Sequence, residues 1–117
     1  IAMEQLLCHL VGDYILQDDW MAQNKKTRSL PAVIHAVLYG LPFLLLRPSP
    51  VALAVIVMTH LLIDGTPLVV WFLRLRNRTS NATGFSPDRP IWLTVWLTII
   101  TDNVIHLCIN YAALRWL

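Results

Sequence analysis

The chain has 117 residues, of which 56% are hydrophobic and 14% are charged. This length suits one domain, residues 1–117, and the charged fraction is well below the quarter that is typical of soluble domains. The net charge of +2 is small, and the basic residues form short clusters between apolar blocks instead of the stripe that nucleic-acid binding needs. The composition therefore predicts a small polytopic membrane protein and no nucleic-acid partner.

The first apolar segment covers about residues 4–16, fewer than the roughly 20 residues that span a bilayer. We expect it to cross incompletely or to lean against the other segments, and to continue as an amphipathic helix to residue 24. No basic region or small-residue cleavage site precedes it, so we expect it to remain in the mature protein. After a polar loop, KKTRS at residues 25–29, a second apolar segment begins near Pro31 and runs to about residue 46.

A tight turn, RPSP at residues 47–50, separates the second apolar segment from the third. The third covers about residues 51–75 and contains Gly65 and Pro67. These two residues disfavour a regular helix and predict a kink or a short break just after Asp64.

A long polar loop at residues 76–89 precedes the last helix, which begins at Pro90 and continues to residue 117. The predicted fold is an all-α, polytopic membrane four-helix bundle with a kinked third helix and a short first segment. Lys and Arg are concentrated in the loops at residues 25–29 and 76–89. The positive-inside rule then predicts that these loops are cytoplasmic and that both termini lie outside.

All four histidines and three of the seven acidic residues lie inside the apolar segments: His9, His35, His60, His106, Asp13, Asp64 and Asp102. An ionised Asp at the centre of a membrane helix costs about 2.5–3.5 kcal/mol on insertion scales, so three of them cost roughly 10 kcal/mol. That cost is comparable to the net stability of a whole domain, and the protein must compensate for it.

Each of the three Asp residues lies four positions from a histidine, which gives three pairs: His9/Asp13, His60/Asp64 and Asp102/His106. Residues four apart share one face of an α-helix, so three helices each present an imidazole and a carboxylate on one stripe. At about 1.5 Å per residue, the three Asp residues and His35 lie at similar depths, about 10–19 Å from the nearest basic loop residue. We therefore expect all seven side chains to face one another inside the bundle.

Nitrogen and oxygen ligands from His and Asp suit Zn²⁺, with Mn²⁺ or Fe as alternatives. A catalytic zinc ion needs only three protein ligands, so seven candidates exceed what one ion requires. The set suits two metals bridged by an Asp, or one metal whose ligands are oriented by Asp–His hydrogen bonds. The alternatives are a metal-free proton relay and polar groups that only hold helices together.

Three stretches carry a family resemblance: HLVGDYILQDDWMAQNK, THLLID and GFSPDRPIWLTVWLTIITDNVIHLCINYAALRWL. They resemble a family of small bacterial and phage inner-membrane proteins, known as domain of unknown function 3307, over nearly the whole chain. The family name carries no activity. The resemblance therefore implies the fold and a multi-pass location in the bacterial inner membrane more than it implies a function.

The H-x-x-x-D turns also resemble those of inner-membrane proteins described as metal-dependent hydrolases and of the zinc phospholipase C and P1 nuclease group. In that group, His and Asp residues from several helices hold a zinc cluster that cleaves phosphate esters. The resemblance implies these ligands here: His9, Asp13, His35, His60, Asp64, Asp102 and His106. The chain lacks the N-terminal Trp ligand of the soluble enzymes and is under half their length, so a shared mechanism is an analogy.

The sequence thus predicts an intramembrane metal-dependent hydrolase of a phosphate ester or diphosphate, with a membrane lipid as substrate. The protein could act as a monomer or as an oligomer. Asp13 or Asp64 would take the proton from the attacking water. The alternatives are a divalent metal or proton transporter and a non-catalytic helical membrane protein. A transport pathway needs polar residues along its whole length, whereas the polar residues here cluster at one level.

Overall fold

The structure is a computed structural model that describes residues 2–117, so that Ile1 of the predicted domain lies outside the described residues. In chain order the elements are α1 (Ala2–Leu10), the π-helix η1 (Val11–Ile15), α2 (Asp19–Asn24), α3 (Ser29–Gly40), the 3₁₀-helix η2 (Pro42–Leu46), α4 (Pro50–Gly65), α5 (Leu68–Asn77) and α6 (Ile91–Trp116). No strand occurs among the described residues, and the predicted all-α class is confirmed.

Two helical stretches are long and apolar enough to cross a membrane, Ser29–Leu46 and Ile91–Trp116. The bent pair of α4 and α5 makes a third if it is counted as one span. The first segment is short, as predicted, because α1 has only 9 residues. Residues 2–117 therefore form an all-α protein with two or three candidate spans. That four segments cross the membrane stays a prediction.

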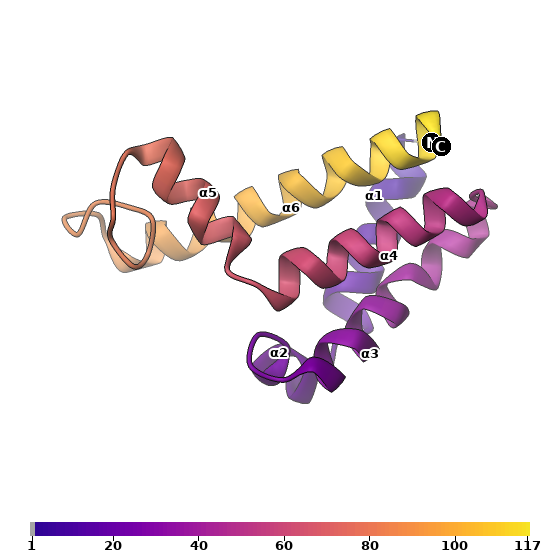
Figure 1. Ribbon diagram of the computed structural model, residues 1–117, viewed down its shortest axis with the longest axis horizontal. Coiled ribbons are helices and arrows are strands. Elements are labelled where there is room, and N and C mark those ends of the chain that lie inside the picture. The colour runs from indigo at the N-terminus through magenta and orange to yellow at the C-terminus, as the bar shows by residue number, and fades with distance from the viewer. Residues whose placement is uncertain (1) are drawn as a thin grey trace.

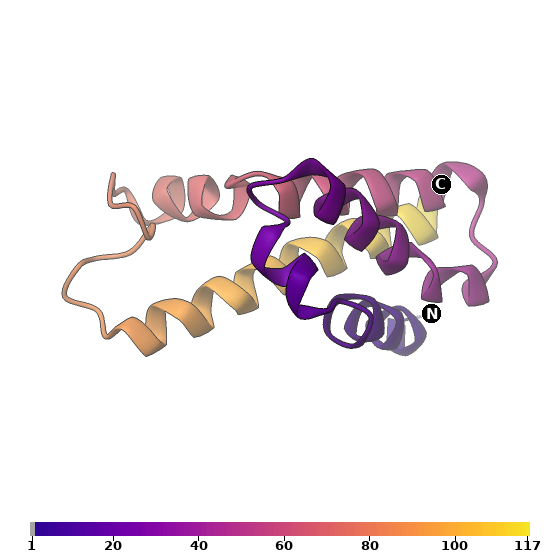
Figure 2. The ribbon, with the colours of Figure 1, turned by 90° about the horizontal axis from the view of Figure 1, so that it is seen from below.

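Helix α6 runs along much of the length of the molecule (Figures 1 and 2). The start of α5 packs on α6, and the two helices diverge toward the loop that joins them (Figure 2). Helix α4 packs against the C-terminal half of α6, α1 also contacts α6, and α3 packs on α4. The loop that links α5 to α6 lies at one end of the molecule. Both termini lie at the other end, where the Ser49 hydroxyl donates a hydrogen bond to the Leu117 carbonyl at 2.8 Å.

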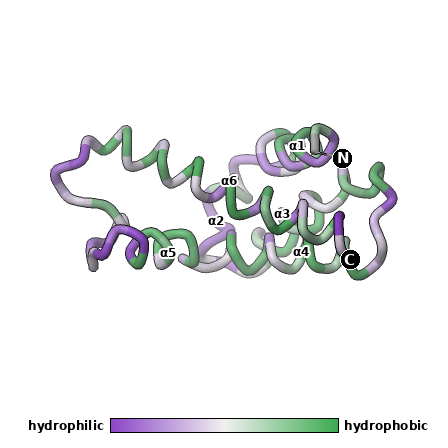
Figure 3. Tube along the Cα trace, turned by 90° about the horizontal axis from the view of Figure 1, so that it is seen from above, coloured by the Kyte–Doolittle hydropathy of each residue, from purple (hydrophilic) through white to green (hydrophobic). Residues whose placement is uncertain are grey.

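The outer surface of the bundle is strongly apolar. Leu45, Leu75 and Ile91 are 84%, 80% and 72% exposed, and many other large apolar side chains are also exposed. Hydrophilic residues are instead concentrated around α2 and in the loop between α5 and α6 (Figure 3). An apolar surface of this extent suits a lipid environment, because soluble proteins rarely expose such continuous apolar area.

The break predicted just after Asp64 is confirmed. Helix α4 ends at Gly65 and α5 begins at Leu68, and the two helix axes are bent by 72°. Thr66 has an extended backbone, and the ring of Pro67 removes a backbone donor that a continuous helix would use. The break leaves Asp64 in the last turn of α4, with the chain turning away from it.

The first segment does not continue as one helix to residue 24, so that expectation is wrong. The chain widens into the π-helix η1, leaves the helical conformation after Leu16 and starts again at Asp19. The Asp18 carboxylate accepts a hydrogen bond from the Met21 backbone N–H at 2.9 Å, which makes Asp18 the N-cap of α2. An Asp before a helical run is a recognised start signal, and it competes with continuation of the preceding helix.

Helix η1 approaches α3 closely at Gly12. A Cβ atom there would lie 2.9 Å from both the Tyr39 carbonyl oxygen and the Tyr39 ring. The contact involves backbone, which cannot move aside as the end of a flexible side chain can. Glycine at this position therefore allows η1 to pack on α3, and this packing places the next residue, Asp13, beside His35.

We expect Gly12→Ala to push η1 away from α3 and to separate Asp13 from His35, at a cost of about 1–3 kcal/mol of stability. Gly65→Ala is the matched control, because its added Cβ would meet only the Ala32 methyl group at 3.9 Å. Thermal unfolding in detergent measures the effect. Equal melting temperatures for the two variants would contradict the close packing at Gly12.

Candidate metal centre

Four buried side chains bring their donor atoms together at the C-terminal end of α4: Asp13 from η1, His35 from α3, and His60 and Asp64 from α4. His35 Nε2 lies 3.1 Å from Asp13 Oδ1 and 3.1 Å from Asp64 Oδ2. His60 Nε2 lies 3.1 Å from Asp64 Oδ2 and 3.8 Å from Asp13 Oδ1. These four residues form the first donor group.

The spacing of the first donor group fits a tetrahedral metal ion. With bonds of about 2.0–2.1 Å, two ligand atoms on a tetrahedral zinc ion lie about 3.3 Å apart. The His–Asp distances in the group are 3.1–3.8 Å, and all its donor atoms lie within 4.8 Å of one another. Two imidazole nitrogens and two carboxylate oxygens are also a donor set that zinc accepts, so the residues fit the ion by both chemistry and distance.

Asp64 belongs to a second donor group as well. Its other carboxylate oxygen, Oδ1, lies 3.3 Å from His106 Nε2, and this nitrogen lies 3.4 Å from Asp102 Oδ1. Asp64, Asp102 and His106 form the second donor group. A carboxylate that presents one oxygen to each of two groups could be shared by two ions, which lie about 3.5–4 Å apart in two-metal sites.

Packing holds the two histidines of the first donor group in place. The His60 ring stacks on the Tyr39 ring with a centroid distance of 3.7 Å and an interplanar angle of 9°. His35 Nε2 and His60 Nε2 lie 2.8 Å apart, so only one of them can carry a proton between them. The Nδ1 atoms of both rings are buried without a hydrogen-bond partner among the described residues, which leaves Nε2 as the atom through which each ring acts.

His9 lies beside the two donor groups and outside both. The Tyr39 hydroxyl donates to His9 Nδ1 at 2.6 Å, while His9 Nε2 lies 2.7 Å from Asn103 Oδ1 and donates to it. Asn110 Nδ2 in turn donates to the Tyr39 hydroxyl at 2.6 Å. Both ring nitrogens of His9 are therefore engaged in a network beside the donor groups. The predicted role of His9 as a direct ligand stays a prediction.

Sequence reasoning missed two lysines, which it assigned only to membrane topology. Lys25 Nζ lies 2.8 Å from Asp64 Oδ2 and 2.9 Å from Gln17 Oε1. Lys26 Nζ donates to the backbone carbonyls of Asp64 and Thr66, at 2.9 and 3.4 Å. Lys26 thereby satisfies carbonyl groups at the C-terminus of α4, where a positive charge is favourable. Lys25 and Lys26 directly follow α2 and lie outside any repeating apolar pattern. No spacing in the sequence could therefore have predicted their contacts with Asp64.

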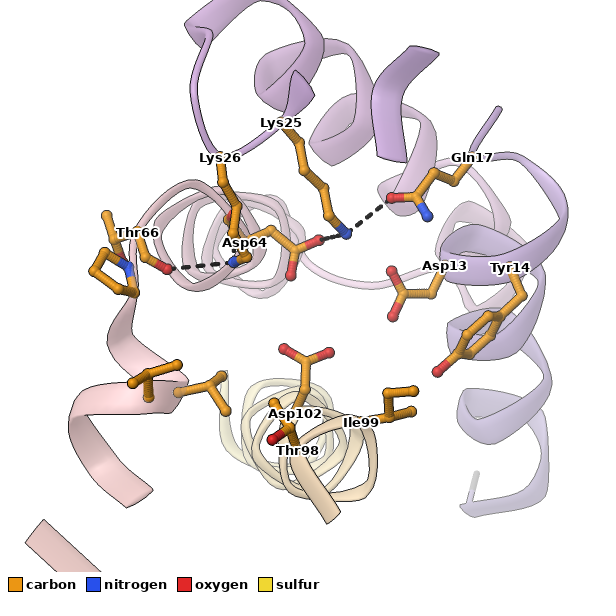
Figure 4. Close-up of a pocket in the computed structure, with 13 residues that line it drawn as sticks. Asp13, Tyr14, Gln17, Lys25, Lys26, Asp64, Thr66, Thr98, Ile99 and Asp102 are labelled. Carbon is orange, nitrogen blue, oxygen red and sulfur yellow. Dashed lines mark hydrogen bonds and ion pairs between the residues drawn. The ribbon is translucent and has the colours of Figure 1, made fainter. Parts of the chain in front are cut away.

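A cavity of about 290 Å³ opens beside the donor groups (Figure 4). The carboxylates of Asp13, Asp64 and Asp102 point into it from η1, α4 and α6, and Lys25 and Lys26 border it. The rest of its wall is mainly formed by uncharged side chains: Tyr14, Gln17, Thr66, Pro67, Val69, Val70, Thr98 and Ile99. A small molecule in the cavity would therefore meet the carboxylate of each of the three His–Asp pairs.

The structure brings six of the seven predicted site residues into the two donor groups: Asp13, His35, His60, Asp64, Asp102 and His106. The Asp102 side chain is 26% exposed toward the cavity, while the others are almost fully buried. Asp/His groups of this kind could hold a metal ion, as predicted; the identity of the ion stays a prediction.

Fold and site together define a class: a small all-α protein with candidate membrane spans and a buried His/Asp cluster. The chain belongs to the family described as protein of unknown function DUF3307, whose model matches residues 1–115. This confirms the family resemblance. No curated protein and no solved structure matches the chain. The looser resemblance to metal-dependent hydrolases stays a prediction.

We expect purified protein to bind divalent metal, with two ions per chain if both donor groups are filled. Asp64→Asn should weaken binding at both groups, whereas His106→Ala should remove only the second ion. Elemental analysis after detergent purification measures the ratio. Asp88→Asn, in the exposed loop before α6, is the control and should leave the metal content unchanged. Wild-type metal content in Asp64→Asn would refute the bridging role.

Proposed function

We propose that this protein is an intramembrane metal-dependent hydrolase of a phosphate ester or diphosphate carried by a lipid, with zinc as the preferred ion and Mn or Fe as alternatives. One observation carries the proposal. The Asp64 carboxylate joins two buried donor groups at a cavity that two lysines border. Paired metals suit phosphoester cleavage, and basic side chains near them suit a phosphoryl group.

The metal would supply an activated water and would polarise the phosphoryl oxygens. The chain must then supply an acceptor for the proton of that water. Both oxygens of Asp64 are engaged, Oδ1 by His106 and Oδ2 by Lys25 and the histidines of the first donor group. Asp13 Oδ2 lies 3.9 Å from His9 Nε2, beyond hydrogen-bond distance, and Asp13 faces the cavity. Of the two predicted proton acceptors, Asp13 is therefore the better placed.

A lipid substrate explains why the site lies among apolar helices. The cavity wall is largely apolar, and the outer surface around it exposes large aliphatic and aromatic side chains. A headgroup could then meet the carboxylates and lysines while its chains remain against apolar surface. The proposal includes a multi-pass protein of the bacterial inner membrane, with a membrane lipid as its substrate.

The core beyond the donor groups weighs against a transporter. Tyr39, Phe43 and Ile56 are fully buried, and together with Ala52 and Ala113 they fill the bundle toward the end where the termini lie. An ion or proton crossing the bundle would need polar partners there, because an unsolvated charge is costly in such surroundings. The buried His and Asp side chains instead form one cluster beside one cavity, and the other buried polar side chains, Gln5, Thr94 and Asn110, carry no charge.

Metal-loaded protein in detergent should release phosphate or a phosphorylated headgroup from at least one of phospholipids, phosphatidic acid or polyprenyl phosphates and diphosphates. EDTA should stop the reaction, and His60→Ala and Asp102→Ala should each reduce turnover by roughly 10–100-fold, since each removes a donor atom of the site. Asp18→Ala is the control, since it removes an N-cap worth about 1 kcal/mol and no group of the cavity.

One set of results would overturn the hydrolase proposal. If metal binds stoichiometrically, no phosphate ester of the panel is cleaved, and liposomes containing the protein take up Zn²⁺ or protons, then the same residues serve transport.

The proposed topology places the loops at residues 25–29 and 76–89 in the cytoplasm. In a background without Cys8 and Cys108, an impermeant maleimide should label Pro48→Cys in intact cells and should not label Ala82→Cys until the membrane is opened. The connection before α4 and the loop between α5 and α6, which contain these two positions, lie at opposite ends of the molecule (Figure 1). The reverse pattern would invert the orientation and leave the metal centre unaffected.

A further inference from the structure

Lys25 competes with the first donor group for its central oxygen. Its ammonium lies 2.8 Å from Asp64 Oδ2, and the Nε2 atoms of His35 and His60 each lie 3.1 Å from the same oxygen. A metal ion bound by the first donor group would take this oxygen as a ligand. A strongly hydrated point charge such as an ammonium gains little by remaining close to a divalent cation, and the two repel each other.

The net charge of the cavity determines when an anion can bind beside Lys25. Three carboxylates and two ammonium groups line the cavity, which leaves a net charge of −1 with neutral histidines. An anionic ligand is therefore disfavoured until metal binds, and one divalent ion reverses the sign of the site. Anion binding should thus depend on prior metal binding.

Only one of the two lysines is free to respond to metal. Lys26 is tied to two backbone carbonyls at the end of α4, so moving it would leave those groups without their donor. Lys25 is held only by side chains, those of Asp64 and Gln17, and it lies in the short connection after α2. Its four-carbon stem can swing within the cavity without moving a helix.

We propose that Lys25 is an exchangeable cation: it neutralises Asp64 while the first donor group is metal-free, and metal binding releases it to hold a phosphoryl anion in the cavity. This inference rests on the proposed function for the kind of anion, a phosphate monoester or diphosphate. Metal and anion then strengthen each other's binding, and linkage requires the two effects to be equal, typically about 5–150-fold.

The chain has only two lysines, which allows a direct test on folded protein. In Lys26→Arg, Lys25 is the only lysine left for an amine-acylating reagent, and in Lys25→Arg it is Lys26. Zn²⁺ should increase the acylation rate of Lys25, and inorganic phosphate added afterwards should lower it again. The rate for Lys26 should not change with either addition. A Lys25 rate that does not respond to Zn²⁺ overturns the proposal.

Binding measurements supply a second, independent readout. Lys25→Met should bind Zn²⁺ more tightly than the wild type, because no internal cation must be displaced, and should lose the phosphate-induced gain in Zn²⁺ affinity. Lys26→Arg, which keeps a positive charge and donors at the end of α4, should keep that gain. Unchanged or weaker Zn²⁺ binding by Lys25→Met, or a retained phosphate effect, would overturn the exchange.

The source of the anion is separated by comparing inorganic phosphate with micelles that contain phosphatidic acid. Protection of Lys25 at a lower concentration of the lipid than of phosphate assigns the subsite to a lipid headgroup, and equal protection assigns it to free phosphate. Neither measurement requires turnover. Lipid hydrolysis without any response of Lys25 to Zn²⁺ would refute the exchange alone, whereas a responsive Lys25 without hydrolysis would refute only the hydrolase.

Discussion

The buried carboxylate of Asp64 is the constraint on which the rest of the structure depends. It is 3% exposed in the middle of an apolar bundle, where an unpaired charge would cost several kcal/mol. Its oxygens are instead surrounded by a lysine from the connection after α2 and by histidines from α3, α4 and α6: Lys25, His35, His60 and His106. Satisfying one carboxylate therefore fixes the relative positions of four parts of the chain.

Departures from regular helix deliver the groups to this point. The π-helix η1 and the close contact of Gly12 with Tyr39 aim Asp13 at His35, and the break after α4 opens the cavity next to Asp64. π-Helical turns and chain breaks inside a membrane bundle are tolerated where other groups satisfy the freed backbone. Lys26 does this for α4, so the same residue stabilises the break and borders the cavity.

The balance of charge explains why a cation is central to this site. Three carboxylates converge on one cavity, and two lysines leave one negative charge uncompensated while the histidines are neutral. In surroundings of low dielectric constant, that imbalance is costly and attracts a divalent ion strongly. In the proposed function, such an ion would make the same cavity favour an anion and would thereby link metal binding to recognition of a phosphoryl group.

The sequence by itself determined the helical class, the apolar segments, the break after Asp64 and the three His–Asp pairs. These features follow from composition, from Gly and Pro, and from a spacing of four residues, all of which act within one helix. Only the tertiary structure decided the partners. It joined Asp13 to His35 and Asp64 to His106, turned His9 toward Tyr39 and Asn103, and brought Lys25 to Asp64. Such contacts depend on how helices cross and on where long side chains reach from a short connection, and no periodicity along the chain encodes either.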